Sequence, residues 1–386
     1  MDPAVAEAGD GEVREVQEIR ADWPLLQRRL ARVAAGGFRL RLCYEAGPTG
    51  YELHRRLTEA GYDCQGIAPS LIPVKAGQRI KTDRRDAIKL ARCLRSGDLT
   101  PVWVPDEPTE ALRDLERARE AAKRAERSAK HQLSKFLLRH GRKWEGGSNW
   151  TLKHLAWIRR QQFEIEALRR VVREGLQAVE EATERVARLM SDIEELVATS
   201  ALAPLVTALA SLRGIATLSA TVIAAEIGDL RRFDSAKQFM AFVGLVPSES
   251  SSGPRTRRGP ITRTGNKHVR RLLIEAAWNA GRPAAISAAL RKRRARVSGE
   301  VRQIAVKAQG RPARKFRHLA YDRHKPPCVV VTAVARDWPA LCGPPSVSNP
   351  GCSPRNGSIL KPSGGNVFHN RFSMRRKKGE RVVGDR

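Results

Sequence analysis

The first 105 residues alternate short apolar runs with helical patterns. Apolar and polar side chains alternate along Phe38–Tyr44, which predicts a β-strand. The following elements are predicted to be a helix at 49–60 ended by Gly61, a strand at 63–68, a helix at 83–96 ended by Gly97, and a strand at 101–104. This order predicts a mostly parallel sheet covered by helices, with a site beyond the carboxyl ends of its strands.

Residues 106–200 have a different pattern, rich in Ala, Glu, Arg and Leu. From Val172 onward, apolar residues recur at steps of three and four: Leu176, Val179, Ala182, Val186, Leu189, Ile193 and Leu196. That spacing is typical of a coiled-coil seam, which leaves two interpretations open. The segment forms a paired or dimerising coiled coil, or a single amphipathic helix packs on the core of its own domain.

Residues 201–336 are predicted to form a mainly helical C-terminal domain. Two apolar helical stretches flank Leu212–Ala216, a loop covers Pro247–Gly265, and a helix follows from about Lys267 to Asn279. Residues 286–336 are basic and largely helical in pattern. Residues 337–386 are rich in Pro, Gly and Ser, which predicts a disordered basic tail.

Charge narrows the possible partners. The 386 residues contain 71 Lys and Arg against 41 Asp and Glu, a formal net charge of +30. Such an excess repels itself in a compact fold, and a polyanionic partner relieves that repulsion through release of counterions. We therefore expect nucleic acid as the partner, the alternatives being a ribosome-like RNA binder or a merely soluble basic protein.

The cysteines and the hydropathy indicate the cellular compartment. None of the six cysteines forms a C-x-x-C pair, so a zinc site is not expected, and their scatter suits reduced thiols. No stretch approaches 18 apolar residues, and the N-terminus lacks a signal pattern. We expect a cytoplasmic protein with no membrane attachment.

Two carboxylates stand at the start of the predicted helix 83–96. Asp83 and Asp86 are three residues apart and fall on the side of Leu90 and Leu94, opposite the basic residues of this helix. Acids at the head of an apolar stripe are costly unless compensated, and Mg²⁺ prefers such oxygen ligands. Glu45, at the end of the first clear strand, is a third candidate ligand. The alternative is that Asp83 caps the helix and Asp86 complements its dipole.

A serine run lies in the predicted loop 247–265. Ser250, Ser251 and Ser252 precede Gly253 and a basic run that contains Arg255, Arg257 and Arg258. A serine hydroxyl there could attack a phosphodiester while arginines hold the phosphate. The alternative, a flexible polar loop without chemistry, is favoured by these residues alone.

Several longer motifs, in one order, resemble a known family. They are Cys43–Tyr51, Ala68–Pro73, Lys81–Ala87, Gly228–Phe233, Gly244–Glu249 and Thr264–Arg271. Together they resemble the DEDD-type insertion-sequence transposases of the one-hundred-and-ten family, also described as bridge-RNA-guided recombinases. The resemblance extends from about residue 4 to residue 336.

The resemblance implies a fold and a set of site residues. It implies an RNase H-like (RuvC-like) α/β domain at 1–105, a helical coiled-coil region at 106–200 and a transposase domain at 201–336. Glu45, Asp83 and Asp86 match three of the four carboxylates that bind Mg²⁺ or Mn²⁺, and Ser252 matches the nucleophile, with Ser251 and Ser250 as fallbacks. The residues expected to bind nucleic acid are Arg255, Arg257, Arg258, Arg263, Lys267, Arg270, Arg271 and Gly214, the last in a helix-hairpin-helix turn.

Partners and one departure also follow from the resemblance. It implies DNA, a structured guide RNA and a homo-oligomer, dimer or tetramer, formed through the helical region. The family's opening Asp lies on a strand that should precede Ala4, so the α/β domain is expected to be truncated; Asp2 is followed by Pro3 and does not take that role. The alternatives are a catalytically inactive nucleic-acid-binding remnant and a metal-dependent junction nuclease.

Overall fold

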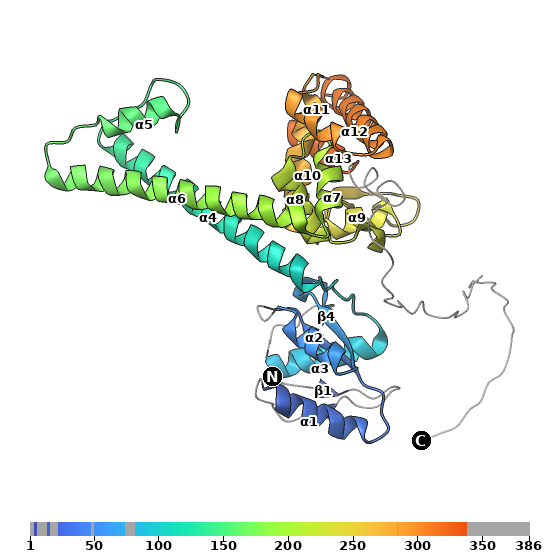
Figure 1. The fold of residues 1–386 in the computed structure, drawn as a ribbon. Helices are drawn as coiled ribbons and strands as arrows, with labels where there is room; N and C mark the ends of the chain where they lie inside the picture. Colours follow the sequence, from blue (N-terminus) through green and yellow to red (C-terminus); the bar gives the residue numbers. More distant parts are fainter. Residues whose placement is uncertain are drawn as a thin grey trace, which may run out of the picture. The chain divides into compact units, whose positions relative to one another are not determined.

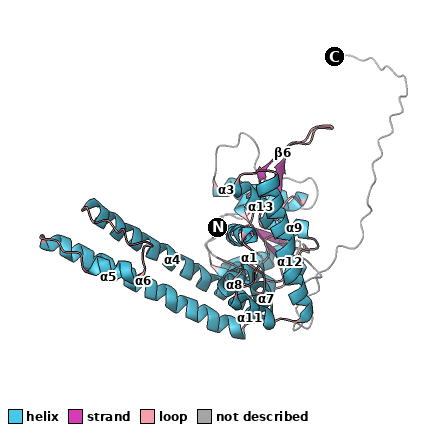
Figure 2. Ribbon diagram, turned by 90° about the horizontal axis from the view of Figure 1, so that it is seen from above, coloured by secondary structure: helices cyan, strands magenta, loops and turns pink. Residues whose placement is uncertain are grey.

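A computed structural model describes residues 22–47, 50–73, 82–283 and 285–337, together with the backbone of Ala4–Val5 and Arg14–Glu15. Helices dominate these residues and the strands are short (Figures 1 and 2). Asp2 and residues 338–386 of the predicted tail lie outside the described residues. The prediction is wrong for Asp337, the first residue of that tail, because its side chain is buried and pairs with Lys315 at 2.8 Å.

The N-terminal part contains short strands and four helices or helical turns. The strands β1 (Ala4–Val5) and β2 (Arg14–Glu15) pair antiparallel, whereas β3 (Arg41–Glu45) and β4 (Asp63–Ile67) pair parallel, with Glu45 opposite Ile67. The helical elements are α1 (Trp23–Ala34), α2 (Glu52–Glu59), the 3₁₀ turn Pro69–Leu71 and α3 (Asp83–Ser96). The predicted helix at 83–96 is confirmed, and Gly97 ends it with a φ of +76°.

The strand predicted at 101–104 is wrong. Only a single antiparallel bridge joins Pro101 to Ile67, and the Val102 N–H donates to the Gly66 carbonyl at 2.8 Å. Proline lacks the N–H that a continuing ladder needs, and the Trp103 ring instead lies against Gly228 of the C-terminal part. In the described residues the parallel sheet therefore consists of β3 and β4 alone.

The middle of the chain is a helical hairpin, formed by α4 (Glu107–Arg139), α5 (Leu152–Arg159) and α6 (Glu166–Thr199). Along α6 the buried side chains Val172, Val179, Val186 and Ile193 recur at seven-residue steps, as the predicted seam requires. The predicted Leu196 is wrong as a seam residue, since it is 54% exposed. Val197, a four-residue step after Ile193, is buried in its place.

The partner of that seam is α4 of the same chain. Leu133 and Leu137 of α4 pack with Val172 and Val179 in one cluster. At the other end, Leu112 of α4 packs with Ile193 and Val197. The two long helices are thus antiparallel and lie side by side (Figures 1 and 2), so the paired coiled coil is formed within one chain.

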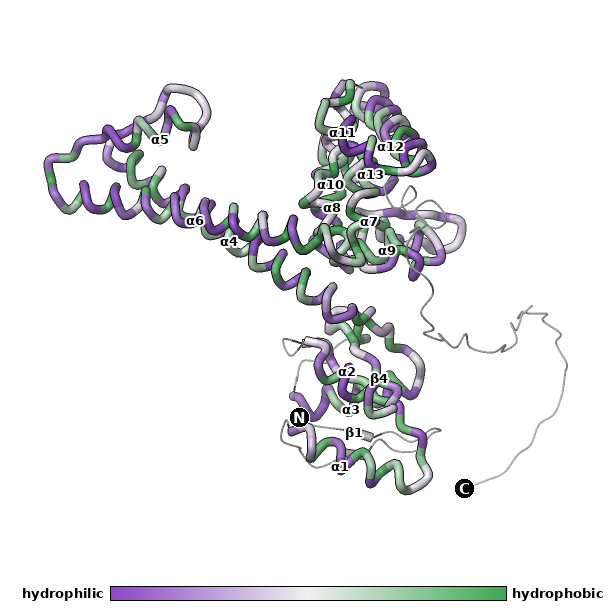
Figure 3. Tube along the Cα trace, viewed as in Figure 1, coloured by the Kyte–Doolittle hydropathy of each residue, from purple (hydrophilic) through white to green (hydrophobic). Residues whose placement is uncertain are grey.

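The C-terminal part has an apolar core of helices. Its elements are α7 (Ala203–Ala210), α8 (Thr217–Ile227), the 3₁₀ turn Leu230–Arg232, α9 (Ala236–Phe242), β5 (Pro247–Glu249), β6 (Arg258–Ile261), α10 (Lys267–Ala277), the 3₁₀ turn Trp278–Gly281, α11 (Ala288–Ala295), α12 (Gly299–Arg317), the π-helical turn His318–Asp322 and α13 (Pro327–Ala335). In α8 every residue from Ala220 to Ile227 is buried. Figure 3 shows this concentration of hydrophobic residues along α7, α8 and α13, in contrast to the mixed surfaces of α4 and α6.

No single described helix is long and apolar enough to cross a bilayer. The pair α6 and α7 passes by length and composition when taken together, but its two helices bend by 113° at their junction.

Candidate active site and nucleic-acid interface

The three predicted metal ligands lie on β3 and on the first turn of α3. Glu45 is the last residue of β3 and is exposed; Asp83 is exposed and Asp86 half-buried. Thr82, not Asp83, caps α3, because its hydroxyl accepts the Arg85 N–H at 3.3 Å. This finding contradicts the alternative in which Asp83 serves as the cap.

Helix α3, which carries two of these carboxylates, has a less buried apolar side than its sequence pattern predicts. Helix α3 contacts β1, β2 and β3, and the Cys43 thiol of β3 donates to the Leu90 carbonyl at 4.0 Å. No residue of α3 is fully buried, however. Across the described parts of the chain, no three or more His, Cys, Asp or Glu side chains are gathered in a way that could hold a metal ion. Glu45, Asp83 and Asp86 therefore do not form a ready three-ligand site.

The serine run forms the turn of a β-hairpin, not the loop that the sequence predicts. Strands β5 and β6 pair antiparallel, and beyond them Ser252 and Arg255 exchange backbone hydrogen bonds, both 3.3 Å long. Gly253 between them has a φ of +58°, a conformation that glycine adopts without strain. We call residues 247–261 the serine hairpin; its tip presents Ser252 at the surface.

A carboxylate and arginines surround the serines on this hairpin. The Ser251 hydroxyl donates to Glu249 Oε1 at 2.9 Å, and Arg258 Nε lies 3.4 Å from Glu249 Oε2. The hydrogen bond from Ser251 and the charge of Arg258 hold the pKa of Glu249 below its usual value. Arg255 and Arg257 are exposed on the same hairpin, so the tip combines hydroxyls with cationic groups.

The other predicted nucleic-acid-binding residues differ in their availability. Arg263 and Lys267 are exposed. Arg270 is half-buried and donates to the Val243 carbonyl at 2.8 Å, and its burial lowers the pKa of its guanidinium. Arg271 is partly exposed and forms an ion pair with Glu120 of α4 at 3.3 Å. Arg270 thus anchors α10 to the segment after α9, while Arg263 and Lys267 are open to a ligand.

The predicted turn around Gly214 is confirmed between α7 and α8. Gly214 has a φ of +89°, and a Cβ at this position would lie 2.7 Å from the Ala276 carbonyl oxygen. No side chain caps the first turn of α8. The turn is therefore packed tightly on α10, and only glycine fits it without strain.

Comparison with known proteins assigns the chain to a family. It is 44% identical over 335 residues to the putative transposase y4qE of Sinorhizobium fredii, covering 86% of this chain and 82% of that protein. It is 29% identical over 318 residues to the transposase for insertion sequence element IS1533 of Leptospira borgpetersenii, covering 81% and 92%. The profile described as "Transposase IS116/IS110/IS902 family" matches residues 206–291, and a DEDD profile described as "Transposase" matches residues 29–141.

The chain belongs to the IS116/IS110/IS902 family of insertion-sequence transposases. Proteins of this family bind DNA and catalyse its transposition, and the DEDD type depends on divalent metal ions. The DEDD match spans Glu45, Asp83 and Asp86, and the second match spans the serine hairpin and Gly214. The resemblance inferred from the sequence motifs is thereby confirmed.

The transposase also contains a buried polar junction that the sequence did not predict. Arg113 of α4 donates to the carbonyls of Ala225 and Glu226, at 2.6 and 3.0 Å. The Glu226 carboxylate accepts the Asn266 side-chain N–H at 2.8 Å, and Asn266 caps α10 through the Val269 N–H.

The Trp103 ring completes this junction, with the guanidinium carbons of Arg113 and Arg232 at 5.0 and 4.9 Å from its centroid. Helix α4, helix α8 and the segment that follows the serine hairpin are therefore joined at one point. The available signal was Glu226, a lone charge within the apolar run of α8.

Proposed function

We propose that this transposase cleaves and joins DNA strands with Ser252 as the nucleophile. The observation that supports this proposal is the serine hairpin, whose tip pairs Ser252 with Arg255 and exposes both. A hydroxyl at an exposed β-turn can approach a DNA backbone closely, and cations beside it attract that backbone.

The chemistry would proceed by two exchanges at phosphorus. The Ser252 hydroxyl loses its proton and its oxygen bonds to the phosphorus, while the bond from phosphorus to one sugar oxygen breaks and that oxygen takes up a proton. A sugar hydroxyl of a second strand then attacks the phosphoserine ester, which restores the serine. Arg255, Arg257 and Arg258 would hold the phosphate and stabilise the charge that develops on it.

We propose Mg²⁺, or Mn²⁺ in its place, as the metal, with Glu45, Asp83 and Asp86 among its ligands. Carboxylate oxygens are the ligands that these ions prefer, and α3 packs against the strand that carries Glu45. Among the residues that the structure describes, the three side chains do not form a three-ligand group. Replacing both Asp83 and Asp86 by Asn should remove the stabilisation that the metal gives to the protein.

We further propose two kinds of partner, a guide RNA and further copies of the same chain. The net charge of +30 supports a structured guide RNA bound together with DNA. A homo-oligomer would have to use the outer surface of the helical hairpin, because α4 already covers the seam of α6. We also propose that the N-terminal part has a RuvC-like fold and that the domains end near residues 105, 200 and 336.

Trapping of the covalent intermediate tests the serine proposal. Donor DNA labelled at one end, incubated with the transposase and denatured, should yield a protein–DNA adduct that Ser252→Ala abolishes. Ser250→Ala and Ser251→Ala are the matched controls and should retain the adduct. Loss of the adduct in Ser251→Ala alone would show that Ser251, and not Ser252, is the nucleophile. An adduct that survives in all three variants would refute the serine run 250–252 as the source of the nucleophile.

A further inference from the structure

Charge is distributed unevenly along the helical hairpin. Residues 130–175, which we call the tip region, contain eleven Lys and Arg against four Glu. The remainder of the hairpin is different: residues 107–129 contain six of each sign, and residues 176–199 contain two Arg against six acids. A solvated helical pair needs no such separation. The excess of positive charge at one end therefore indicates a polyanionic ligand there.

Aromatic rings accompany these cations. Three of the seven tryptophans of the chain, Trp144, Trp150 and Trp157, lie in the tip region together with Phe136 and Phe163. His154 connects the tryptophans, since its ring stacks on Trp157 at 5.6 Å and its Nδ1 accepts the backbone N–H of Trp150 at 2.8 Å.

Cations stand over three of the rings. Lys130 lies over Trp150 at 5.5 Å, Arg139 over Phe136 at 5.5 Å and Arg142 over Phe163 at 5.4 Å. Phe163 is buried, whereas Phe136 and Trp150 are half-buried and pack against the same hydrophobic cluster. Partly open aromatic rings beside Lys and Arg are typical of surfaces that bind unpaired nucleotides, because every base has a face that stacks.

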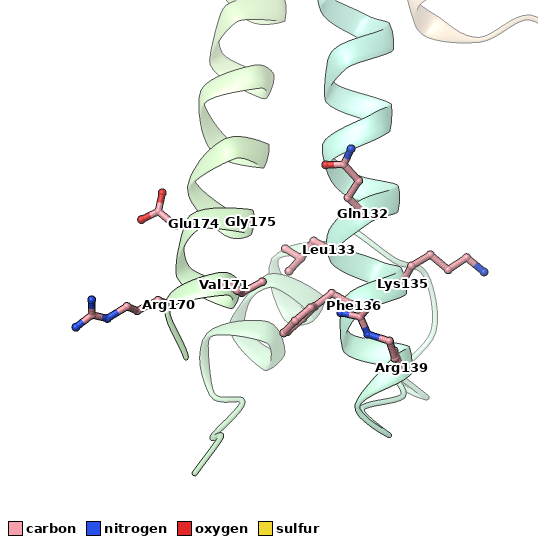
Figure 4. A pocket seen from close by; sticks show the side chains of 9 residues that line it. All are labelled: Gln132, Leu133, Lys135, Phe136, Arg139, Arg170, Val171, Glu174 and Gly175. Atoms are coloured by element: carbon pink, nitrogen blue, oxygen red, sulfur yellow. The ribbon is translucent and has the colours of Figure 1, made fainter. Parts of the chain in front are cut away.

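A groove of about 740 Å³ opens between α4 and α6 in this region. Figure 4 shows Leu133, Phe136 and Val171 between the two helices, with Gly175 beside them. The absence of a side chain at Gly175 keeps the groove open, since a Cβ there would lie 3.1 Å from Leu133 Cδ1. The floor is thus apolar and includes one aromatic ring.

The margins of the groove are mainly cationic. Lys135 and Arg139 line it from α4, and Arg170 lines it from α6 together with Glu174, the one acid among the lining residues. The side chains of Lys135, Arg170 and Glu174 point outward from the space between the helices (Figure 4), and Arg170 also pairs with Glu166 at 3.1 Å. Val171 on the floor is 45% exposed, so part of its side chain is open to a ligand. The apolar floor suits a flat, weakly polar group, and the cationic margins suit an anion. A nucleotide combines both, because its base is flat and its phosphate is negatively charged.

We propose that the tip region is a second nucleic-acid site, which binds unpaired nucleotides of a single strand. A base lies on Phe136 and Val171 in the groove, and the neighbouring phosphates contact Arg139, Arg170 and Lys135. Stacking on such a ring favours unpaired bases, since in a duplex the base faces are covered. This site is independent of the serine hairpin and needs no particular nucleophile.

Binding of short fluorescent oligonucleotides to the full chain tests the proposal. Three probes of one sequence are compared by anisotropy: single-stranded DNA, single-stranded RNA and the DNA duplex. Val171→Asp places a negative charge on an exposed part of the floor. It should weaken single-strand binding about tenfold, the size expected from the loss of one stacked base and one phosphate contact, and affect duplex binding less. The tighter of the two single strands identifies the natural source.

Matched variants separate the groove from general charge. Leu196→Asp introduces the same charge at an exposed apolar residue of α6 outside the tip region and should leave binding unchanged. Arg139→Gln with Arg170→Gln should weaken single-strand binding more than Arg124→Gln with Arg188→Gln, which removes one exposed arginine from each of the same helices.

Two outcomes would overturn the proposal. One is equal loss of binding in the tip variants and in their controls, with helical content retained in all. The other is a groove that serves a second copy of the chain: sedimentation would then show Val171→Asp dissociating an oligomer while single-strand binding is unchanged. Ser252→Ala should not alter single-strand binding at the tip region, so this proposal and the serine proposal can fail separately.

Discussion

In the C-terminal part, α8 buries eight consecutive residues, whereas in the N-terminal part neither α1 nor α3 contains a fully buried side chain. Between residues 22 and 100, the buried hydrophobic residues that the structure describes are Leu57, Cys64 and Ile67. The C-terminal core instead continues from Leu205 to Ala335. The serine hairpin is therefore attached to a part of the chain with many buried apolar side chains. The elements that carry the carboxylates belong to a part with few of them.

This difference bears on function. A nucleophile needs a fixed position relative to the phosphate, and the packed helices around α8 and α10 provide it. Carboxylates on a sparsely packed segment can be rearranged at lower cost, because fewer apolar contacts must be broken.

The largest effect is expected in the C-terminal core. Ile223, at 2% exposure in α8, packs among residues of the largest hydrophobic cluster. Ile223→Ala should lower the free energy of unfolding by about 4 kcal/mol, since it removes buried methyl groups and leaves a cavity. Urea titration followed by circular dichroism measures this loss. Leu196→Ala, at an exposed site, should cost less than about 0.5 kcal/mol; similar losses in both variants would contradict the picture of the core.

The turn between α7 and α8 should show the next largest effect. Gly214→Ala forces a positive φ on a residue with a Cβ and brings that Cβ against the Ala276 carbonyl. A loss of about 2 kcal/mol is expected from the two strains. Gly299→Ala, where a Cβ meets nothing within 4 Å, should not destabilise the protein. Equal melting temperatures for the two variants would show that the turn is not constrained.

A smaller effect is expected at the buried junction. Glu226→Gln removes a charge from a carboxylate that is 8% exposed and bonded to Asn266 and Arg117. The expected loss is about 1–2 kcal/mol, the range for one partner of a buried hydrogen bond. Glu275→Gln, in an exposed ion pair with Arg271, should change stability by less than about 0.5 kcal/mol. The difference between their urea midpoints tests whether the junction stabilises the fold.

The reactivity of the cysteine thiols compares the N-terminal and C-terminal parts without any substitution in the chain. Burial raises the pKa of the Cys43 thiol to about 11 and that of Cys64 to about 12. Only the thiolate is nucleophilic, so at pH 8 both should react with iodoacetamide far more slowly than the exposed Cys328, and faster as pH rises. Peptide mass spectrometry measures each rate. In low urea, Cys43 and Cys64 should become reactive before the helical signal falls; simultaneous changes would mean that both parts unfold together.

Local signals predicted several elements correctly. The end of α3 was predicted from Gly97, which adopts a left-handed conformation, because this signal acts within one turn of the helix. Its start was predicted correctly as well, but the cap is Thr82 and not the Asp83 that the sequence suggested. The seam of α6 is readable for the same reason, since its period repeats within a single helix. The prediction could not include the partner of that seam, which lies far away in the sequence.

Contacts between distant residues account for the errors. The strand predicted at 101–104 failed because Trp103 packs on Gly228, more than a hundred residues later. The serine hairpin was missed because Ser, Gly and Pro favour loops, while its register depends on pairing across the turn. The anchoring of Arg270 to the Val243 carbonyl likewise depends on how α9 and α10 pack. For the candidate site, the sequence motifs suggested which residues to consider. The distances among Glu45, Asp83 and Asp86 depend on how β3 and α3 pack, and motifs do not contain that information.

The most direct measurement is to identify the amino acid that becomes joined to DNA. The transposase is incubated with donor DNA, denatured and digested with trypsin and nuclease, and the peptide spanning residues 238–255 is sequenced by mass spectrometry. If Ser252 is the nucleophile, this peptide carries a nucleotide remnant on Ser252, and no remnant is found when the Ser252→Ala variant is treated in the same way. A remnant on a residue outside the serine hairpin, or strand joining with no covalent adduct at any stage, would contradict it.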